Sequence, residues 1–489
     1  MFSCCRQSLF AVFALSLVAG AGGCAKVDNI ATVDSGLPVM TAGADARTGG
    51  SDSAATAIDV APVDVPVVPP CVGLECQRVT CAGDPTSLSG TVFAPNGQLP
   101  LYNVMVYVPN APLEPFKAGV TCDRCGVVAS GHPIATAISN EEGKFVIKNV
   151  PAGKDIPLVF QVGKWRRKVT IPTVTACQDN PIADPQLTRL PRNRTEGDMP
   201  KIAVTTGQCD QLGCLLPKIG VDTSELGVAG EDKAVAYYSG GSALFGSLGG
   251  ATFGPPNMRP STELWNDEAV LSQYDITLLS CECGEELETK TATSFDAMTK
   301  YLNRGGRIFG SHYSYVWFRD SPDPMFSSAA SIMGFSPGAA KGPLTIDVTF
   351  PKGKALADWM KFLDPTITYG EIAAEQVFND IASAMKPAAL VWASSPTIGA
   401  NRMMMDDRPR IVTVNTPAGA PADQQCGRAA ELDAHITSVP TFVPNSQATA
   451  FPAICGDDLT KGIEALAFLF FDLSACVQDD TKPVMPPIP

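Results

Sequence analysis

The sequence predicts a multidomain protein in which a small all-β sandwich is followed by a larger α/β domain with a mostly parallel sheet. Two observations carry this prediction. Residues 81–177 hold short runs of alternating apolar and polar residues separated by Gly, Pro and Asn turns, which is typical of a β-sandwich. Residues 201–478 alternate strand-like and helix-like segments, which indicates a sheet covered by helices. The polar, Pro-rich residues 178–200 are expected to be a linker, and 479–489 a C-terminal tail.

The first residues, 1–23, have the pattern of a secretory signal peptide. One charge, Arg6, precedes an apolar run, and small residues then lead to Cys24. The run is too short for a permanent membrane-spanning helix. A Cys directly after small residues resembles the lipobox of bacterial lipoproteins, which implies acylation of Cys24. The Ala25 that follows favours the outer membrane or cell surface as the location; secretion without an anchor is the alternative.

Residues 24–80 are expected to form a disordered tether behind this anchor. They are rich in Ala, Asp, Gly, Ser, Thr, Val and Pro and contain "VAPVDVPVVPP". No period in them could bury an apolar face. Such a segment would hold the folded domains away from the membrane.

The charge limits the class of partner. The formal net charge is −14, so nucleic-acid binding is not expected. The one basic cluster, "KWRRK" at 164–168, could contact an anionic envelope polymer, although the solvated face of an edge strand is the more common interpretation.

The cysteines agree with export. Thirteen of the 16 lie beyond Cys24, and many cysteines in an exported chain indicate disulfides. Because thirteen is odd, at least one is free or pairs between chains. The CxxC formed by Cys122 and Cys125 predicts a local disulfide, with half a zinc site or a redox motif as alternatives. Cys81 and Cys177 flank the first domain and are expected to staple its ends.

The first domain resembles the carboxypeptidase regulatory-like domain, a prealbumin-like sandwich. The resemblance implies a non-catalytic spacer or binding module, and some relatives of the fold bind carbohydrate. A long insertion at 111–133 is where binding is expected, because loops on a rigid scaffold carry function. His132 in this insertion could contact a ligand, or be an ordinary exposed histidine. The residues that carry the resemblance are Gly90-Thr91-Val92, Pro95, Gly97, Val104 to Val108, Gly143-Lys144-Phe145 and Val150-Pro151-Ala152-Gly153.

The second domain is expected to begin with strands and helices in alternation. Its apolar periodicity predicts helices at 261–273, 287–302, 353–363, 371–384 and 460–477. Strands are expected at 201–206, 233–240, 275–280, 307–309, 344–350, 388–393, 410–415 and 427–435.

Three segments of this domain resemble the ThuA-like branch of the class I glutamine-amidotransferase-like superfamily. They are "YDITLLSCECG" (274–284), "LNRGGRIFGSHY" (302–313) and "CGRAAELDAHI" (426–436). The resemblance covers about 205–477 and implies a flavodoxin-like arrangement. An amidotransferase needs a thiolate at the elbow after the fourth of these strands. Ser311 and His312 stand there instead, so glutamine hydrolysis is not expected and no catalytic residue is predicted.

The candidate cleft consists of Ser311, His312, Asp433 and His435. The last three could converge at the carboxyl ends of neighbouring strands, where open α/β sheets place ligands. Two imidazoles and a carboxylate could bind a metal or perform acid/base chemistry; a hydrogen-bonded structural set is the alternative. Ser311 could attack a substrate only beside a base and an orienting carboxylate.

Three further segments have functional interpretations that are less favoured. Cys281-Glu282-Cys283-Gly284 could be a reactive thiol edge, but a disulfide or buried thiols are expected. The Gly-rich segment 239–250 lacks phosphate-loop spacing and is expected to be a surface loop. Met403-Met404-Met405 could contact a soft metal, but a loop packed on the core is expected.

The sequence as a whole favours a cell-surface lipoprotein that binds an envelope or extracellular ligand, such as a glycan, without catalysis and without a cofactor. The alternative is a hydrolase or other sugar-acting enzyme that uses the cleft of His312, Asp433 and His435, with or without a metal.

Overall fold

The computed structural model describes residues 71–207, 209–210, 212–241, 253–334, 340–398, 404–435, 450–456 and 458–485. The signal peptide, Cys24, the tether up to residue 70, most of the Gly-rich segment 239–250 and the side chains of Met403-Met404-Met405 lie outside the described residues. Contacts along the chain separate Met1–Val68 from Pro69–Pro489, and the second of these is one compact unit. Among the described residues, no helix is both long enough and apolar enough to cross a bilayer.

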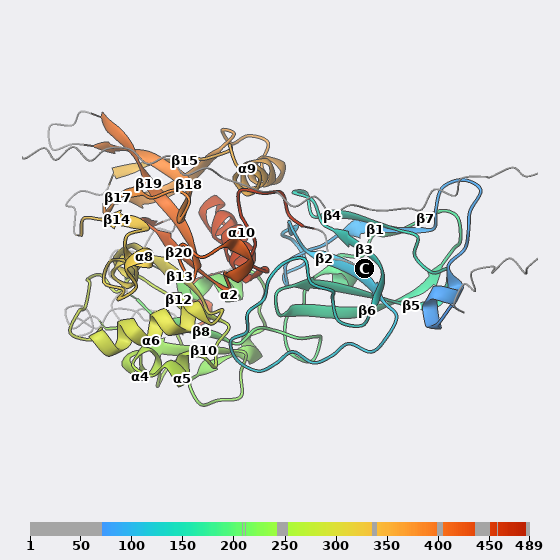
Figure 1. Cartoon of the computed structure of the whole chain (residues 1–489), viewed down its shortest axis with the longest axis horizontal. Helices are drawn as coiled ribbons and strands as arrows, with labels where there is room; N and C mark the ends of the chain where they lie inside the picture. Colours follow the sequence, from blue (N-terminus) through green and yellow to red (C-terminus); the bar gives the residue numbers. More distant parts are fainter. Residues whose placement is uncertain are drawn as a thin grey trace, which may run out of the picture. The chain divides into compact units, whose positions relative to one another are not determined.

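The unit is mostly β-sheet and is built from several sheets (Figure 1). Its N-terminal part, the β module (residues 87–182), contains a three-stranded sheet in the order β4-β1-β7 and a four-stranded sheet in the order β3-β2-β5-β6. Side chains of both sheets share one core, in which Phe145 and Phe160 meet edge to face at 5.8 Å. The strands are β1 (Ser87–Thr91), β2 (Met105–Pro109), β3 (Pro133–Ile138), β4 (Lys144–Lys148), β5 (Gly153–Val162), β6 (Trp165–Val174) and β7 (Asp179–Ile182).

Two segments that were expected to lack structure belong to this module. Within residues 178–200, which were expected to be a linker, β7 pairs in parallel with β1 and α1 (Pro185–Thr188) follows. Within the expected tether 24–80, a 3-10 helix (η1, Gly73–Gln77) is closed by the Cys71–Cys76 disulfide and held by Asn110, whose side chain accepts from the Leu74 N–H. Both segments have a polar composition, so the sequence did not predict their structure. Backbone pairing orders the first segment and a disulfide orders the second, and neither depends on the burial of apolar side chains.

The C-terminal part, the α/β module (residues 202–474), is built on a twelve-stranded sheet. One half is parallel and runs in the order β11-β10-β8-β12-β13-β20, with β9 paired to β10. The strands are β8 (Ile202–Thr205), β9 (Leu226–Val228), β10 (Val235–Ser239), β11 (Arg259–Pro260), β12 (Ile276–Leu279), β13 (Arg307–Ser311) and β20 (Gly427–Leu432).

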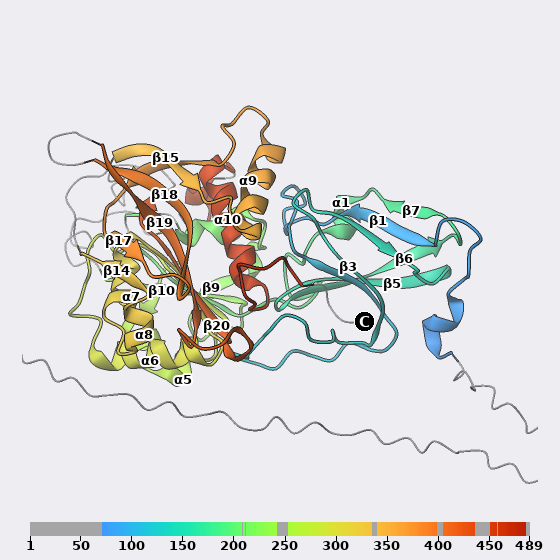
Figure 2. The same cartoon turned by 45° about the horizontal axis from the view of Figure 1, so that its top comes forward.

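The other half of the sheet is antiparallel, so the expectation of a mostly parallel sheet is wrong for it. It continues from β20 through β19 (Met404–Thr416), β18 (Ala389–Ile398), β15 (Ala340–Ile346), β16 (Glu371–Val377) and β21 (Ala434–His435). Short connections join β18 to β19 and β19 to β20, and connections this short fit antiparallel neighbours. The long β18–β19 hairpin is visible in Figure 2.

The helix expected at 371–384 is also wrong. Residues in this segment form β16 and β17 (Ile381–Ala384), and β17 pairs with β14 (Ala330–Ile332) in a separate two-stranded sheet. The segment is rich in Ala and Glu, which favour helices, but the antiparallel ladder between β15 and β16 overrides that local preference.

Helices cover both faces of the parallel half. On β8, Ala203 packs with the cluster of α4–α6, whereas Ile202 and Val204 pack with α10. The helices are α2 (Leu215–Lys218), α4 (Thr262–Trp265), α5 (Glu268–Leu271), α6 (Ala292–Asn303), α7 (Val316–Arg319), α8 (Pro324–Ser327), α9 (Pro351–Leu363) and α10 (Lys461–Ser474). Further 3-10 turns are η2 (Leu212–Cys214), η3 (Thr223–Glu225), η4 (His312–Tyr315), η5 (Ala422–Gln424) and η6 (Ala453–Cys455).

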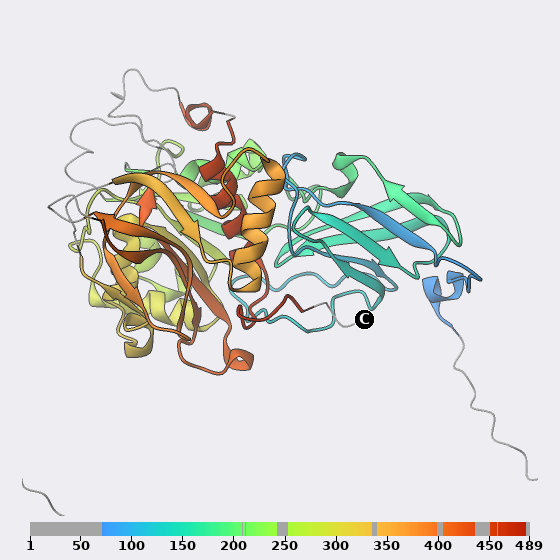
Figure 3. The ribbon, with the colours of Figure 1, turned by 90° about the horizontal axis from the view of Figure 1, so that it is seen from above.

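The apolar helix α10 lies between the large sheet and the β module (Figures 1 and 3). Every residue from Gly462 to Ser474 is buried because the sheet covers one side of the helix and the β module the other. Tyr102 stacks on Phe468 with ring centroids 5.7 Å apart, and Trp165 contacts Phe471 at 6.1 Å. The two modules therefore share one continuous core.

Six disulfides reinforce this arrangement. Cys81 pairs with Cys177, as their flanking positions predicted. The prediction of a local Cys122–Cys125 disulfide is wrong: Cys122 pairs with Cys426, just before β20, and Cys125 pairs with Cys476, just after α10. The remaining pairs are Cys71–Cys76, Cys209–Cys283 and Cys214–Cys455. Cys281 is the free cysteine of the described residues and is buried.

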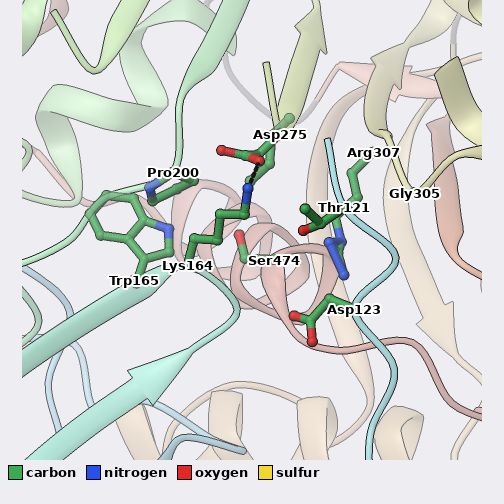
Figure 4. Close-up of a pocket in the computed structure, with 10 residues that line it drawn as sticks. Thr121, Asp123, Lys164, Trp165, Pro200, Asp275, Gly305, Arg307 and Ser474 are labelled. Carbon is green, nitrogen blue, oxygen red and sulfur yellow. Dashed lines mark hydrogen bonds and ion pairs between the residues drawn. The ribbon is translucent and has the colours of Figure 1, made fainter. Parts of the chain in front are cut away.

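The basic segment 164–168 lies at the junction of the two modules. The Nζ of Lys164 is 2.6 Å from Oδ1 of Asp275, and both line a cavity of about 20 Å³ (Figure 4). Trp165 and Arg166 are buried, and Arg166 donates to Asp198. The segment is part of an edge strand, as expected. However, Lys164 and Arg166 form ion pairs with Asp275 and Asp198 at the junction of the two modules.

The C-terminal tail is not loose over its described residues. Asp480 is 6% exposed and forms a buried ion network with Lys352, Arg428 and Asp472. This network ties the end of the chain to α9, β20 and α10.

Candidate functional site

The carboxyl ends of three adjacent parallel strands place the candidate residues together. Leu279 of β12 pairs with Gly310 of β13, which in turn pairs with Glu431 of β20. The residues that follow these positions, including Cys281 and His312, therefore meet at one edge of the sheet. His312 begins η4 with φ 46°, a left-handed conformation that is uncommon for a residue other than glycine. The elbow predicted at Gly310-Ser311-His312 is present, and His312 is its strained residue.

Ser311 faces a carboxylate and not a histidine. Its hydroxyl donates to Oδ2 of Asp210 in a short hydrogen bond. The backbone N–H of Cys281 donates to the same carboxylate at 3.0 Å and to the Ser311 hydroxyl at 3.1 Å. The proton of Ser311 is thus directed to Asp210, and the arrangement is not that of a serine activated by an imidazole.

His312 is held on three sides. Its Nδ1 lies 3.5 Å from Sγ of Cys281, and its Nε2 lies 3.4 Å from Oδ2 of Asp380. The ring stacks on Phe378 with centroids 3.4 Å apart and planes 9° from parallel. Burial lowers the pKa of His312, against the opposing effect of Asp380, so the neutral imidazole is favoured.

His435 approaches from the antiparallel half of the sheet. It lies on β21, opposite Gln376 of β16, and its Nδ1 is 3.0 Å from Oε1 of that residue. Its Nε2 is buried and has no hydrogen-bond partner among the described residues. The ring centroids of His435 and His312 are 5.1 Å apart. Burial, together with the smaller effect of His312, lowers the pKa of His435 to about 3.

Asp433 does not join the two histidines, so this part of the predicted cleft is wrong. Its Oδ2 accepts from the Ile381 N–H at 3.1 Å and lies 3.4 Å from Nη1 of Arg410. Asp433 was expected to converge with His312 and His435 at the carboxyl ends of neighbouring strands. The chain bends at Asp433 instead, after β20 ends at Leu432 and before β21 pairs with β16.

Several acids of this cluster were not predicted from the sequence. Glu431 is 1% exposed, and neither of its carboxyl oxygens has a hydrogen-bond partner among the residues that the structure describes. It lies against Gly310, where a Cβ would come within 2.4 Å of Oε2. Burial, together with Asp433, Asp380 and Asp210, raises the pKa of Glu431 well above its usual range. Glu431 could have been predicted, because it is an acidic residue within the apolar strand segment "GRAAELDAH". The sequence around Asp210 and Asp380 gives no comparable indication that these acids belong to the site.

The atoms suited to metal binding belong to Cys281, His312 and His435. One donor atom from each lies within 4.8 Å of the other two, and all three side chains are buried. The structure thus replaces the expected trio of His312, Asp433 and His435 with one in which a thiol takes the place of the carboxylate. The neighbouring Cys283 is paired with Cys209, which agrees with the expected disulfide in this segment.

A separate groove of about 240 Å³ lies beside the insertion 111–133. Its walls include Phe116, Gln161 and Asn103 from the β module, and Met485 from the C-terminal segment. Val127, Val128 and Met485 are between 45% and 60% exposed around it. His132 is exposed and is not among the residues that line the groove.

Comparison with known proteins gives only weak similarities. No protein-family model matches the chain, and no curated protein matches it. Structural neighbours include a ThuA-like protein from Bacteroides uniformis, 10% identical, covering 55% of this chain and 89% of that one, with a TM-score of 0.29. A cytoplasmic protein from Salmonella typhimurium is 10% identical over 57% and 100% of the two chains, with a TM-score of 0.29. A cohesin–X-dockerin complex from Acetivibrio cellulolyticus matches 22% of this chain and 56% of that one at 17% identity, with a TM-score of 0.13. TM-scores this low assign neither fold nor function.

Proposed function

We propose that the protein is exported, is anchored in the outer membrane or at the cell surface through Cys24, and binds an envelope or extracellular ligand without acyl-enzyme catalysis. Six disulfides support export, since such bonds persist in oxidising compartments. The signal-like residues 1–23 and the tether-like residues after Cys24 support the anchor. We expect Cys24→Ala to release the protein from membranes; retention in the membrane fraction at high salt would contradict the anchor.

The ligand site of this proposal is the groove beside the insertion. Exposed apolar side chains around a concavity are typical of binding surfaces. The cavity is smaller than the roughly 300–1,000 Å³ of sites for drug-sized ligands, so it suits a single unit, such as one sugar residue of a glycan. Phe116 offers an aromatic surface, although Arg166 lies 4.1 Å from its ring centroid, and Asn103 offers an amide.

The finer assignment of the modules is part of the same proposal. We assign the β module to carboxypeptidase regulatory-like sandwiches, which are spacers or binding modules. We assign the α/β module to a flavodoxin-like, ThuA-like arrangement. The spatial order β10-β8-β12-β13-β20 supports the second assignment. The chain forms these five strands in the order β8, β10, β12, β13, β20, so their order across the sheet is 2-1-3-4-5, as in flavodoxin-like folds.

One observation above all supports the absence of acyl-enzyme catalysis: the side chains that could attack a substrate are buried and almost inaccessible to solvent. Cys281 is 0% exposed and Ser311 is 2% exposed. The histidines are nearly as buried, with His312 at 5% and His435 at 4%. An acyl-transfer enzyme needs its nucleophile at the surface of a cleft.

A thiol hydrolase is the second candidate, because Cys281, His312 and Asp380 form a chain with contacts of 3.5 and 3.4 Å. This order of thiol, imidazole and carboxylate is that of a cysteine hydrolase. However, burial and then Asp210 raise the pKa of the Cys281 thiol well above its usual range. Reactive cysteines occupy electropositive, partly exposed surroundings, so Cys281 has the character of an inert thiol.

Covalent probes distinguish binding from catalysis. We expect the native protein to resist both a serine-directed fluorophosphonate and iodoacetamide, whereas the denatured, unreduced protein takes up one alkyl group on Cys281. Stoichiometric labelling of the native protein that is lost in Ser311→Ala or Cys281→Ser would overturn the non-catalytic proposal.

Groove binding is tested with envelope polysaccharide and purified protein in a co-sedimentation assay. We expect the double variant Phe116→Ala, Val128→Asp to lose binding. The matched control is Val146→Asp, since Val146 is also about half exposed (54%) but lies on β4, away from the groove. Equal binding by both variants would rule out this groove.

A further inference from the structure

Three side chains with metal-binding chemistry converge in the α/β module, away from the groove. Cys281 follows β12, His312 follows β13, and His435 lies on β21. Each contributes one donor atom to a group that spans no more than 4.8 Å. We propose that Cys281, His312 and His435 bind one transition-metal ion of borderline or soft character, with Zn²⁺ as the expected ion.

The orientation of His435 supports this site independently of its proximity to the other two residues. Gln376 occupies Nδ1 of the ring, at 3.0 Å from its amide oxygen, and so favours the tautomer that carries the proton on Nδ1. The opposite nitrogen, Nε2, then presents a lone pair. This atom is buried and has no hydrogen-bond partner among the described residues, although buried polar atoms are rarely left unsatisfied. A metal ion would satisfy it.

His312 has the complementary arrangement. The Asp380 carboxylate is 3.4 Å from Nε2, which leaves Nδ1 facing Cys281. Histidines that bind metals usually direct their other ring N–H to a carboxylate or a carbonyl, which fixes the ring and its tautomer. The stacking of His312 on Phe378 restrains the ring further. Each imidazole therefore has one nitrogen engaged by a second residue and one directed to a common point.

The donor set selects the class of ion. One sulfur and two imidazole nitrogens suit zinc or copper, whereas Mg²⁺ and Ca²⁺ prefer oxygen. Around a tetrahedral zinc, with Zn–N and Zn–S bonds of about 2.0–2.3 Å, donor atoms lie roughly 3.5 Å apart. Cys281 and His312 already have this separation, at 3.5 Å. The other two separations among the three donor atoms are no more than 4.8 Å.

The surroundings also suit a cation. Asp210, Glu431 and Asp433 are at most 5% exposed beside the site, and Arg410 contacts Asp433. A bound cation would stabilise the ionised form of each of these buried carboxyl groups. Three protein ligands leave one position of a tetrahedral ion for a small exogenous group.

The test is metal titration of the full-length mature protein after treatment with a chelator. We expect one equivalent of zinc to bind, and cobalt(II) to give a thiolate-to-metal charge-transfer band. Cys281→Ser is expected to abolish the band, and His435→Gln to abolish stoichiometric binding. Gln376→Ala, which removes only the group that orients His435, is expected to weaken zinc binding about 10–100-fold. His132→Gln is the matched control, because His132 is an exposed histidine in the insertion and its substitution should change nothing.

Far-ultraviolet circular dichroism of each metal-free variant shows whether the variant is folded. If the Cys281 and His435 variants do not fold, two measurements still test the proposal. They are the cobalt charge-transfer band of the wild-type protein and the weaker zinc binding expected of Gln376→Ala. The proposal is overturned if the wild type binds no zinc, if its cobalt complex lacks a thiolate band, or if Gln376→Ala and His132→Gln bind equally well. These readouts are separate from polysaccharide binding and from covalent labelling, so the metal site and the proposed function can fail independently.

Discussion

The thiol sulfur of Cys281 lies 3.5 Å from Nδ1 of His312, although the two residues are 31 positions apart in the chain. The sheet makes this contact, since β12 and β13 are parallel neighbours and both residues follow the carboxyl ends of those strands. Burial keeps the thiol protonated and inert, but a metal ion would hold it as a thiolate. The contact between Cys281 and His312 is therefore better suited to metal binding than to catalysis.

The disulfides between the modules are expected to stabilise the fold substantially. With Cys125–Cys476 intact, the bond between Cys122 and Cys426 still closes a loop of roughly 50 residues in the unfolded chain. We expect the double variant Cys122→Ser, Cys426→Ser to lose about 2–5 kcal/mol in the free energy of unfolding, measured by denaturant titration without reductant. The Cys71–Cys76 bond spans 5 residues, and its removal is the control with a smaller expected loss. Peptide mapping that recovered a Cys122–Cys125 bond would contradict this connectivity.

The buried ion network is expected to make the C-terminal segment essential for stability. Asp480 contacts Lys352 at 2.6 Å and Arg428 at 2.7 Å, and all three side chains are at most 6% exposed. We expect Asp480→Asn to cost about 3–5 kcal/mol because it leaves two buried cations, Lys352 and Arg428, with Asp472 as their one remaining carboxylate in the network. The neighbouring Asp479 bonds only locally to Thr481 among the contacts found for it, so Asp479→Asn should change stability by less than about 1 kcal/mol. Similar losses in the two variants would contradict the role of the network.

Stability at acid pH is expected to depend on Glu196. Hydrogen bonds from Arg189, at 2.6 and 2.8 Å, lower the pKa of Glu196 from 4.5 to about 2. A carboxylate whose pKa is depressed on folding stabilises the protein above its unfolded pKa and loses that contribution as the pH falls through the folded value. The wild-type protein should therefore have a higher free energy of unfolding than Glu196→Gln near neutral pH. This difference should shrink as the pH falls from 4.5 to about 2.

Denaturant titrations of both proteins across this pH range provide the measurement. Glu263→Gln is the control, because Glu263 of α4 forms an exposed ion pair with Arg259 of β11 and such pairs contribute about 0–1 kcal/mol. A difference for Glu196→Gln that stays constant with pH would show that the Arg189 contact is not the cause.

Local signals predicted the parallel half of the α/β module better than the antiparallel half. The glycine turn after Arg307-Ile308-Phe309 marked the end of β13 and its elbow, because chain direction there is set by adjacent residues. The segment 371–384 has helix-forming composition, and only its pairing with β15 and β14 makes it β-structure. Such pairing is decided by residues far away in the chain, so periodicity within the segment could not reveal it.

The candidate site was predictable in the same partial way. His312 and His435 are two of three histidines in the sequence, and each follows or ends a recognisable strand. Asp433 was predicted wrongly: the chain bends at this residue, between β20 and β21, and its carboxyl group contacts Ile381 and Arg410. Asp380 and Gln376 flank the histidines through β16 and β21, a pairing that local sequence does not encode.

The most direct test of the metal site is X-ray absorption at the zinc edge of the protein loaded with one equivalent of zinc. The proposed site predicts one sulfur neighbour at about 2.3 Å and two imidazole nitrogens at about 2.0–2.1 Å, with the sulfur shell absent in Cys281→Ser. A first shell made only of oxygen and nitrogen in the wild-type protein would contradict it.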